Sequence, residues 1–316
     1  MSTLVETILF VFGLVAAGYL SGLIGYLRVE TGDAVAEFAV AVALPLLLFR
    51  TMLTADFEGA APWALWGCYF TAVAVTWTTA HLAMTRGFGR DARAGVVGGV
   101  TGAFSNLVLL GIPFMLGIFG QEGFEILSML VAVHLPTMIA ASIILFEWVG
   151  RGEGEPKSLA QLGQAFLRRM FTNPLIIGIL LGLAMRFVGV TLPALPLRLI
   201  DSLANVAGPI ALFAMGLSLR KYGIARNVPA GVVLSGLKLV LMPAVALAMA
   251  WLLGLPPLTA KVVVAAASLP AGVNSYLIAM QFGTGQALAS NAMTIGTAAA
   301  VFTTAMWLAI AQMVFG

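Results

Sequence analysis

Apolar runs about 20 residues long recur along this chain and constrain its fold more than any other feature. Each run is close to the length at which a helix crosses the ~30 Å apolar core of a bilayer. The chain is 61% hydrophobic and only 9% charged, whereas soluble domains carry about 25% charged residues. The sequence therefore predicts an all-α integral membrane protein. We place ten transmembrane spans at residues 5–26, 34–53, 62–84, 92–118, 124–149, 173–190, 197–218, 228–253, 258–281 and 286–312.

The basic residues fall mainly in alternate loops between these spans. Eleven of the 16 Lys and Arg residues lie in loops on one side, and four lie in the loops on the other. Because positively charged loops stay in the cytoplasm, we expect a multi-pass protein of the bacterial inner membrane with both termini outside. This topology explains the basic composition, and the net charge of only +3 does not indicate a nucleic-acid partner.

One polar stretch, the linker at 150–172, divides the predicted spans into two sets of five. We therefore expect a first repeat at 1–149 and a second at 173–316. Because five is odd, the second set enters the membrane from the opposite face, which makes the repeat inverted. Both halves carry Pro, two apolar residues, Leu and Phe in their second span, at 45–49 and 209–213.

Two of the spans contain residues that interrupt a helix. Pro270 and Gly272 lie near the middle of 258–281, and Pro113 follows a Gly-rich and Ser-containing stretch in 92–118. In lipid such a break persists only against protein or a polar cavity. Two interrupted spans at corresponding places of two halves indicate the binding site of a transporter. The alternative is that Gly, Ser and Asn only allow close helix packing there.

Two ionisable residues are predicted to lie deep in the membrane. Lys238 lies about mid-depth in 228–253, and His134 lies about mid-depth in 124–149, while no Asp or Glu lies at a comparable depth. Burying a charge in a bilayer is costly, so such residues are typical of functional sites. We favour a cavity that attracts an anion. The alternatives are that Lys238 bonds the freed carbonyls of a broken helix and that His134 is a satisfied core residue.

The last span carries a polar stripe. Ser290, Thr294 and Thr297 recur at helical spacing with Asn291 beside them, and we expect this face to point into the bundle. Helix packing alone is the alternative explanation of the stripe.

Cofactor, metal and enzyme functions are not indicated. Cys68 is the only cysteine and the two histidines are far apart, so the sequence predicts neither a disulfide nor a metal site. An intramembrane protease would need a nucleophilic serine motif, and Ser21-Gly22 and Ser235-Gly236 both lack the preceding glycine. We therefore predict a protein that is not an enzyme and has no cofactor. A channel is harder to exclude, because interrupted helices also line pores.

Several motifs together resemble the auxin efflux carrier family, in its prokaryotic branch. Their order along the chain is more specific than any one of them. The motifs are Leu44–Phe49, Ser105-Asn106 followed by Leu110–Pro113, Asn173–Gly178, Leu212–Leu219, Lys238 followed by Pro243, and Ala267–Asn274.

This resemblance implies the ten-helix inverted-repeat fold that bile-acid sodium symporters share. Spans 1, 2, 6 and 7 would form a scaffold, which often dimerises, and the other spans a mobile transport domain that moves like an elevator. Interrupted spans 4 and 9 would cross at a small organic anion. The residues implied as substrate contacts are Ser105, Asn106, Asn274, Ser275 and Tyr276; Pro113, Pro270 and Gly272 would mark the crossing, and Lys238 would act electrostatically.

Coupling to sodium is the remaining question at the level of sequence. A sodium site usually needs carboxylates or several oxygen ligands, and this interior offers amides, hydroxyls and carbonyls. Our hypothesis is therefore sodium-independent transport of organic anions. A sodium-coupled symporter of the same fold and an anion channel are the alternatives.

The sequence departs from the family pattern at one place beside the predicted site. Leu107-Val108 stands where that pattern leads us to expect a small residue and an aromatic residue, and this difference affects the shape of the pocket.

Overall fold

The computed structural model describes residues 3–54, 62–149, 161, 163–164, 167–168, 171–222, 224 and 228–316. Every regular element in this part of the chain is a helix, which confirms the predicted all-α class. Most of the linker predicted at 150–172 lies outside the described residues.

Six helical segments among the described residues are long and apolar enough to cross a membrane. One of them, Leu107–Val149, has 43 residues and would be about 65 Å long if straight, twice the apolar thickness of a bilayer. Gly120 interrupts it with a non-helical backbone at positive φ (φ 63°, ψ −154°), a conformation that favours glycine. The other five are Val5–Leu23, Glu30–Thr54, Ala194–Lys221, Val228–Leu252 and Gln286–Phe315, and two shorter apolar helices are Pro174–Val188 and Pro257–Ser268.

The chain forms two compact units. Unit 1 combines Met1–Ala60, Val108–Val133 and Arg168–Lys221, and unit 2 combines Ala61–Leu107, His134–Leu167 and Tyr222–Gly316. Both units therefore contain segments from each predicted repeat.

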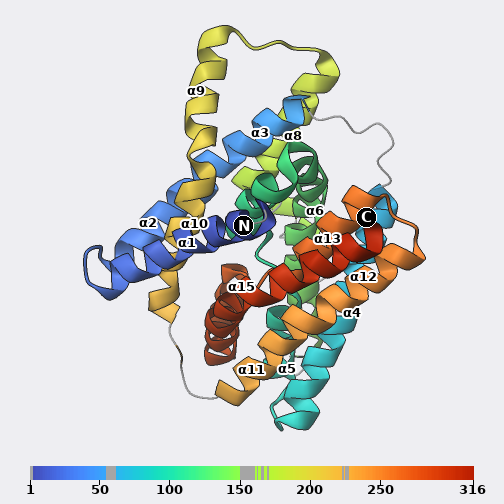
Figure 1. Ribbon diagram of the computed structural model, residues 1–316. Coiled ribbons are helices and arrows are strands. Elements are labelled where there is room, and N and C mark those ends of the chain that lie inside the picture. The colour runs from blue at the N-terminus through green and yellow to red at the C-terminus, as the bar shows by residue number, and fades with distance from the viewer. Residues whose placement is uncertain are drawn as a thin grey trace. The chain divides into compact units, whose positions relative to one another are not determined.

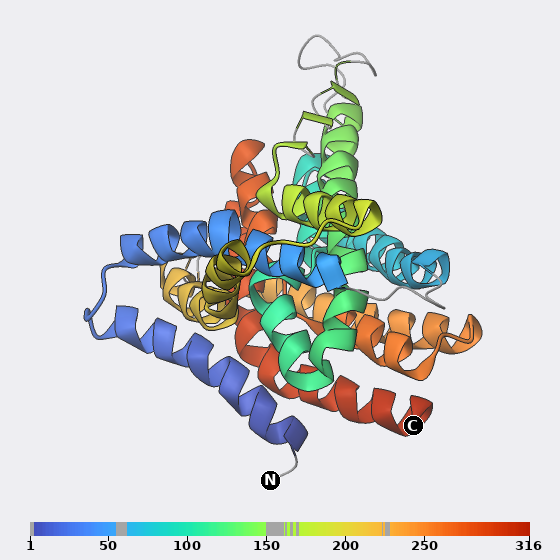
Figure 2. The same cartoon turned by 90° about the horizontal axis from the view of Figure 1, so that it is seen from above.

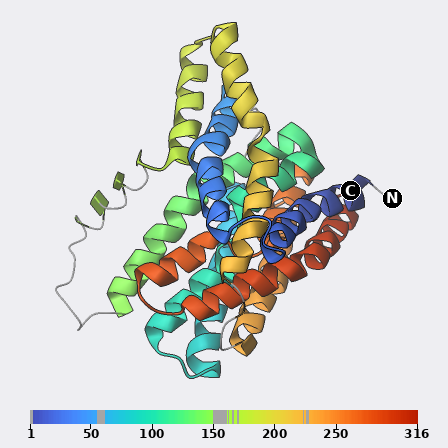
Figure 3. The same cartoon turned by 90° about the vertical axis from the view of Figure 1, so that its left-hand side faces the viewer.

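Unit 1 is built from helices near the N-terminus and from the middle of the chain. Figure 2 shows the turn that joins its first two helices, and Figure 3 shows the turn between α8 and α9. The bounds are α1 Thr3–Leu23, α2 Val29–Phe38, the π-helical turn η1 Ala39–Ala43, α3 Leu44–Thr54, α8 Pro174–Val188, α9 Ala194–Asn205 and α10 Ala207–Tyr222. The π-helical turn η3 (Leu107–Gly111) and the first part of α6 (Ile112–Val149) complete the unit.

Local signals in the sequence account for the ends of α8. Asn173 accepts a hydrogen bond at its side-chain oxygen from the backbone N–H of Leu175 (2.9 Å), and Pro174 occupies the first helical position. Gly189 ends the helix in the left-handed conformation (φ 71°), which costs glycine little.

Glycines bring two pairs of helices in unit 1 into backbone contact. On α8, a side chain at Gly178 or Gly182 would overlap the Pro45 or Phe49 carbonyl of α3. On α1, a side chain at Gly18 would overlap the Phe213 carbonyl of α10. Small residues of this kind let helix backbones approach closely in membranes.

Unit 2 is built around α4, α5 and the last five helices (Figure 1). Helix α5 begins at Asp91, whose carboxylate accepts a hydrogen bond from the Ala94 N–H at 2.7 Å. The bounds are α4 Pro62–Leu82, the π-helical turn η2 Ala83–Gly87, α5 Ala92–Ala103, α11 Val228–Gly236, the π-helical turn η4 Leu237–Leu241, α12 Met242–Leu252, α13 Pro257–Ser268, α14 Val273–Gln281 and α15 Gln286–Phe315.

The core of unit 2 combines alanines with larger apolar residues. Helix α4 packs against α5 and α12, while α11 and α13 pack against α15. One buried cluster joins α4, η2, α11 and α15 and consists of Ala80, Met84, Ala230, Leu234, Leu288 and Ala292. Its alanines allow close spacing between these helices.

The division into units differs from the expected scaffold and transport domain in one segment. Residues 108–133 were expected to pack with unit 2, whereas they belong to unit 1. Specific contacts explain this placement. Gly117 lies against Thr7 of α1, and the Gln121 amide donates a hydrogen bond to the Thr51 hydroxyl at 3.3 Å.

Candidate functional site

Two non-helical stretches of unit 2 are joined by backbone hydrogen bonds. Helix α5 ends at Ala103 and η3 begins at Leu107, while α13 ends at Ser268 and α14 begins at Val273. Between these ends, Ser105 and Ala271 form an antiparallel bridge. The Asn106 N–H donates to the Pro270 carbonyl (2.9 Å), and the Gly272 N–H donates to the Phe104 carbonyl (3.0 Å). We call residues 104–106 and 269–272 the junction.

The residue types at the junction explain its conformation. Leu269 is extended (ψ 148°), as a residue before proline tends to be, and Pro270 has no N–H with which to continue α13. A Cβ at Gly272 would lie 3.3 Å from the Cα of Asn106, so a larger residue there would push the two stretches apart. The junction therefore depends on Pro270 for the break and on Gly272 for the close approach.

The carbonyl end of α13 is bonded by side chains from other parts of unit 2. The Lys238 ammonium donates to the Ala267 carbonyl at 2.6 Å, and the Thr304 hydroxyl donates to the Ser268 carbonyl at 3.2 Å. The Ser268 hydroxyl bonds back to the Ala265 carbonyl at 2.8 Å. Because the C-terminal end of a helix carries partial negative charge, the Lys238 ammonium stabilises it electrostatically as well as by hydrogen bonding.

The opposite end of the break, the N-terminus of α14, has a different environment. Gly272 occupies the cap position and offers no side chain to bond the first N–H groups of the helix. The Ser275 hydroxyl is buried and donates to the Gly272 carbonyl at 2.7 Å, while Asn274 is half-buried in the first turn. Uncapped N–H groups and about half a positive charge make such a helix end attractive to anions.

A buried group of polar and aromatic side chains adjoins the junction at Ser105. The His134 ring packs edge-on against Phe104 (centroids 4.7 Å apart) and against Tyr69 (5.5 Å). The Tyr69 hydroxyl and the His134 ring both face Ser105, but within the described residues neither meets standard hydrogen-bond geometry with a partner. Buried polar atoms are almost always hydrogen-bonded in proteins, so this group is a candidate place for a polar ligand.

Lys238 is buried beside this group, with only 1% of its surface exposed. A lysine ammonium has three donors, and among the described residues Ala267 is the acceptor it bonds. The chain from 222 to 316 contains no Asp or Glu at all. Lys238 therefore has no carboxylate partner within its own C-terminal segment.

The structure gathers most of the predicted residues at the junction. The junction itself contains Ser105, Asn106, Pro270 and Gly272. The first turn of α14 contains Asn274, Ser275 and Tyr276. The junction is flanked by Lys238 and His134. Pro113 lies elsewhere, in unit 1, where it packs against Gly208.

The predicted stripe on α15 faces the interior in part. Asn291 and Ser290 are buried, and Asn291 packs against Gly231 of α11, whereas Thr294 is half-buried. The Thr297 hydroxyl bonds to the Met293 carbonyl of its own helix at 2.7 Å. Gly296, between these residues, lies against Pro270, so α15 backs the junction through a glycine and through Thr304.

Sequence reasoning missed Thr304 and Tyr69. Thr304 lies seven residues beyond Thr297, which places it on the same face of α15 as the predicted stripe, and this spacing is the signal that could have identified it. Tyr69 is a hydroxyl-bearing residue in the middle of an apolar helix, and this is the signal that could have identified it.

Metal binding is not indicated by the donors that are present. In the part of the chain that the structure describes, no three His, Cys, Asp or Glu side chains cluster closely enough to hold a metal ion.

Comparison with known proteins identifies the family. A profile of the membrane transport protein family matches residues 3–308. An uncharacterized transporter of Methanothermobacter thermautotrophicus is 26% identical over 279 residues, which cover 87% of this chain and 88% of the relative. A "Putative malonate transporter" of Rhizobium meliloti is 30% identical over 304 residues, which cover 93% and 92% of the two chains. The chain therefore belongs to the membrane transport protein family, the family of the auxin efflux carriers.

Proposed function

We propose that this protein is a secondary transporter of small organic anions and that it binds their carboxylates at the junction of unit 2. The Rhizobium meliloti relative is named for malonate, a small dicarboxylate, and its similarity extends over nearly the whole chain. Small carboxylates are therefore the substrate class that we assign to this chain.

The observation that carries the proposal is that side chains bond one helix end at the junction and leave the other uncapped. The negative end of α13 is neutralised by Lys238 and Thr304, whereas the positive end of α14 has no side-chain cap. The site therefore offers N–H donors and net positive potential, and the unpaired Tyr69 hydroxyl and His134 ring lie beside it. A carboxylate has four acceptor positions and fits this donor set.

The mechanism that we propose is alternating access in a ten-span inverted repeat. Helices α1 and α8 would be the first spans of the two halves, and α3 and α10 the second. The glycine contacts support this symmetry, because Gly18 of α1 meets the Phe213 carbonyl and Gly182 of α8 meets the Phe49 carbonyl. Each Phe ends the shared Pro-containing motif. Equivalent contacts between the first span of one half and the second span of the other are expected from a two-fold relation.

In this mechanism unit 2 carries the substrate across the bilayer like an elevator, while unit 1 acts as the scaffold and as the contact surface of a homodimer. The protein would lie in the bacterial inner membrane with both termini outside, in agreement with the distribution of Lys and Arg between the loops.

We further propose that transport does not require sodium. Unit 2 has few acidic residues, and the nearest in sequence to the junction is Asp91, which caps α5 at its far end. A sodium ion at the junction would therefore have only amide, hydroxyl and carbonyl oxygens as ligands. A sodium-coupled symporter of the same fold is the second candidate, and an anion channel is the third.

Uptake into proteoliposomes tests the proposal. We expect saturable malonate uptake that is accelerated by unlabelled carboxylate inside the vesicles and is unchanged when a sodium gradient is removed. Strict dependence on sodium would favour the symporter. Conductance without saturation would favour the channel, and no flux with any carboxylate of a broad panel would contradict the proposed substrate class.

A further inference from the structure

Unit 1 contains a cavity of about 210 Å³ that is separate from the junction. It lies among α1, α3, the start of α6, and the segment from α9 into α10. Its wall is largely apolar and includes Phe10, Leu47, Pro113 and Leu212, while Arg50 and Asn205 provide its polar groups. Among the residues that line the cavity, Arg50 is the charged one.

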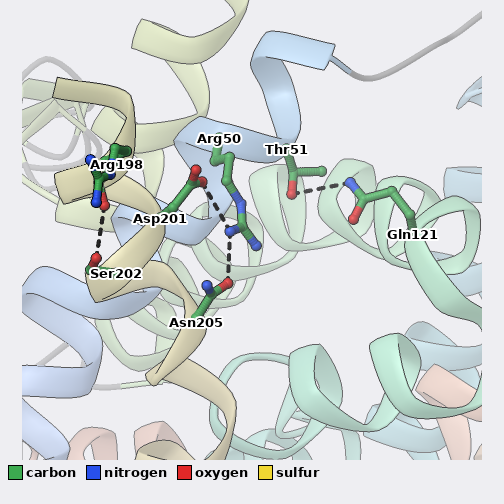
Figure 4. Close-up of polar contacts among 7 residues, drawn as sticks. All are labelled: Arg50, Thr51, Gln121, Arg198, Asp201, Ser202 and Asn205. Atoms are coloured by element: carbon green, nitrogen blue, oxygen red, sulfur yellow. Dashed lines mark hydrogen bonds and ion pairs between the residues drawn. The ribbon is translucent and has the colours of Figure 1, made fainter. Parts of the chain in front are cut away.

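Only one nitrogen of Arg50 is occupied by its partners. The Nη1 atom donates to the Asp201 carboxylate at 3.2 Å and to the Asn205 side-chain oxygen at 2.8 Å. Figure 4 shows both bonds converging on this nitrogen, with the second terminal nitrogen on the side away from Asp201. The Nε and Nη2 atoms make no hydrogen bond within the described residues. Arg50 therefore keeps three N–H donors in a geometry that suits a carboxylate.

The environment of Arg50 leaves it available to a ligand. Its side chain is 29% exposed and that of Asp201 is 40% exposed. An ion pair this exposed is held weakly, and Asp201 competes with an incoming anion without blocking the free nitrogens.

We propose that this cavity is a second anion site, which binds a monocarboxylate with a compact apolar body. The carboxylate bonds the free nitrogens of Arg50, and the apolar body packs between Leu47, Pro113 and Leu212. An apolar cavity of about 150 Å³ holds benzene, so a volume of 210 Å³ accommodates a ring of that size together with a carboxylate. The site differs from the junction in having an apolar wall, and for this reason it selects against small dicarboxylates such as malonate.

Binding of benzoate to the purified full-length protein tests this site. The variant Asn106→Ala/Asn274→Ala, which removes two amides of the proposed transport site, serves as the background. Benzoate binding at the cavity is then measured separately from carboxylate binding at the junction. We expect calorimetry to detect benzoate binding in this background and no binding of the neutral benzamide. Arg50→Gln should weaken benzoate binding about tenfold or more, because it removes charge-assisted hydrogen bonds. Asp201→Asn should strengthen binding about two- to fivefold, because it removes a competing negative charge.

Two further arms identify the source of the carboxylate and control for general effects. Lys221→Gln breaks another exposed ion pair of unit 1, with Asp33, and should leave benzoate affinity unchanged. Displacement of benzoate by laurate in nanodiscs would assign the site to carboxylates that arrive from the bilayer, and absence of displacement would assign it to soluble acids. Unchanged benzoate affinity in both Arg50→Gln and Asp201→Asn, or equal binding of benzamide, would overturn the proposal.

Discussion

Replacing Lys238 by methionine tests the role of the buried charge. The change removes the ammonium that bonds the Ala267 carbonyl and keeps an unbranched side chain of similar length. The lost bond to a charged donor is worth about 1.5–3 kcal/mol, and the carbonyl left unpaired costs about 1–3 kcal/mol. The desolvation of a buried ammonium, several kcal/mol, is no longer required. Because these terms oppose each other, we expect the free energy of unfolding to change by about 2 kcal/mol or less.

Anion affinity should change more than stability. For an anion roughly 8 Å from the ammonium, an effective dielectric constant of about 20 gives an attraction of about 2 kcal/mol. Its loss corresponds to a decrease in affinity of about thirtyfold. Lys238→Arg keeps the charge but adds a bulkier planar group, so it should retain a larger share of the activity.

The assay measures initial carboxylate uptake into proteoliposomes at low substrate and the melting temperature of the same preparations. We expect Lys238→Met to melt within about 4 °C of the wild type and to transport about thirtyfold more slowly. Lys261→Met is the matched control, because Lys261 is a lysine of unit 2 whose bonds to Gln312 and Gly316 are exposed to solvent. Wild-type uptake by Lys238→Met would refute the reasoning. Equal uptake by Lys238→Met and Lys238→Arg would show that Lys238 stabilises the C-terminal end of α13 and does not attract the anion.

Three further substitutions follow from the same contacts. Tyr69→Phe removes a buried hydroxyl that has no hydrogen-bond partner among the described residues; it should leave the melting temperature unchanged or raise it, and should slow uptake if the hydroxyl binds substrate. Gly216→Ala places a methyl group onto the Val15 carbonyl and should destabilise unit 1 by about 1–3 kcal/mol in thermal unfolding, whereas Gly13→Ala on the same helix pair meets open space and should not. Asp91→Ala removes the cap of α5 and should cost about 1 kcal/mol in the same assay. Equal melting of Gly216→Ala, Asp91→Ala and the wild type would contradict these two assignments.

Hydrophobicity and local backbone chemistry made much of the structure predictable. The span placed at 228–253 corresponds to α11–α12, which run from Val228 to Leu252, and the span placed at 286–312 corresponds to α15. Pro270 and Gly272 lie where the backbone leaves the helical conformation, because the missing N–H and the missing side chain act locally. The arrangement as a ten-span inverted repeat stays a prediction.

Contacts between distant residues were not predictable from the sequence. The partner of Lys238 was left open between an anion and a freed carbonyl, and the structure has it on the Ala267 carbonyl. Thr304 also bonds the end of α13. Its spacing from Thr297 gives the helix face on which it lies but not this partner. The pairing of Arg50 with Asp201 likewise depends on how α3 and α9 pack. Both residues lie near the ends of predicted spans, and their positions in the sequence do not predict that they are partners.

Protection of a thiol at the junction measures the central claim directly. In a Cys68→Ser background, Asn274→Cys introduces the only thiol, at a half-buried position in the first turn of α14. Gln281→Cys introduces one at the exposed C-terminal end of the same helix and serves as the reference. Reaction with an anionic methanethiosulfonate is followed with and without saturating malonate and other small carboxylates. The account predicts that a transported carboxylate slows modification at position 274 and not at position 281. An unchanged rate at position 274 with every carboxylate that the protein transports would contradict it.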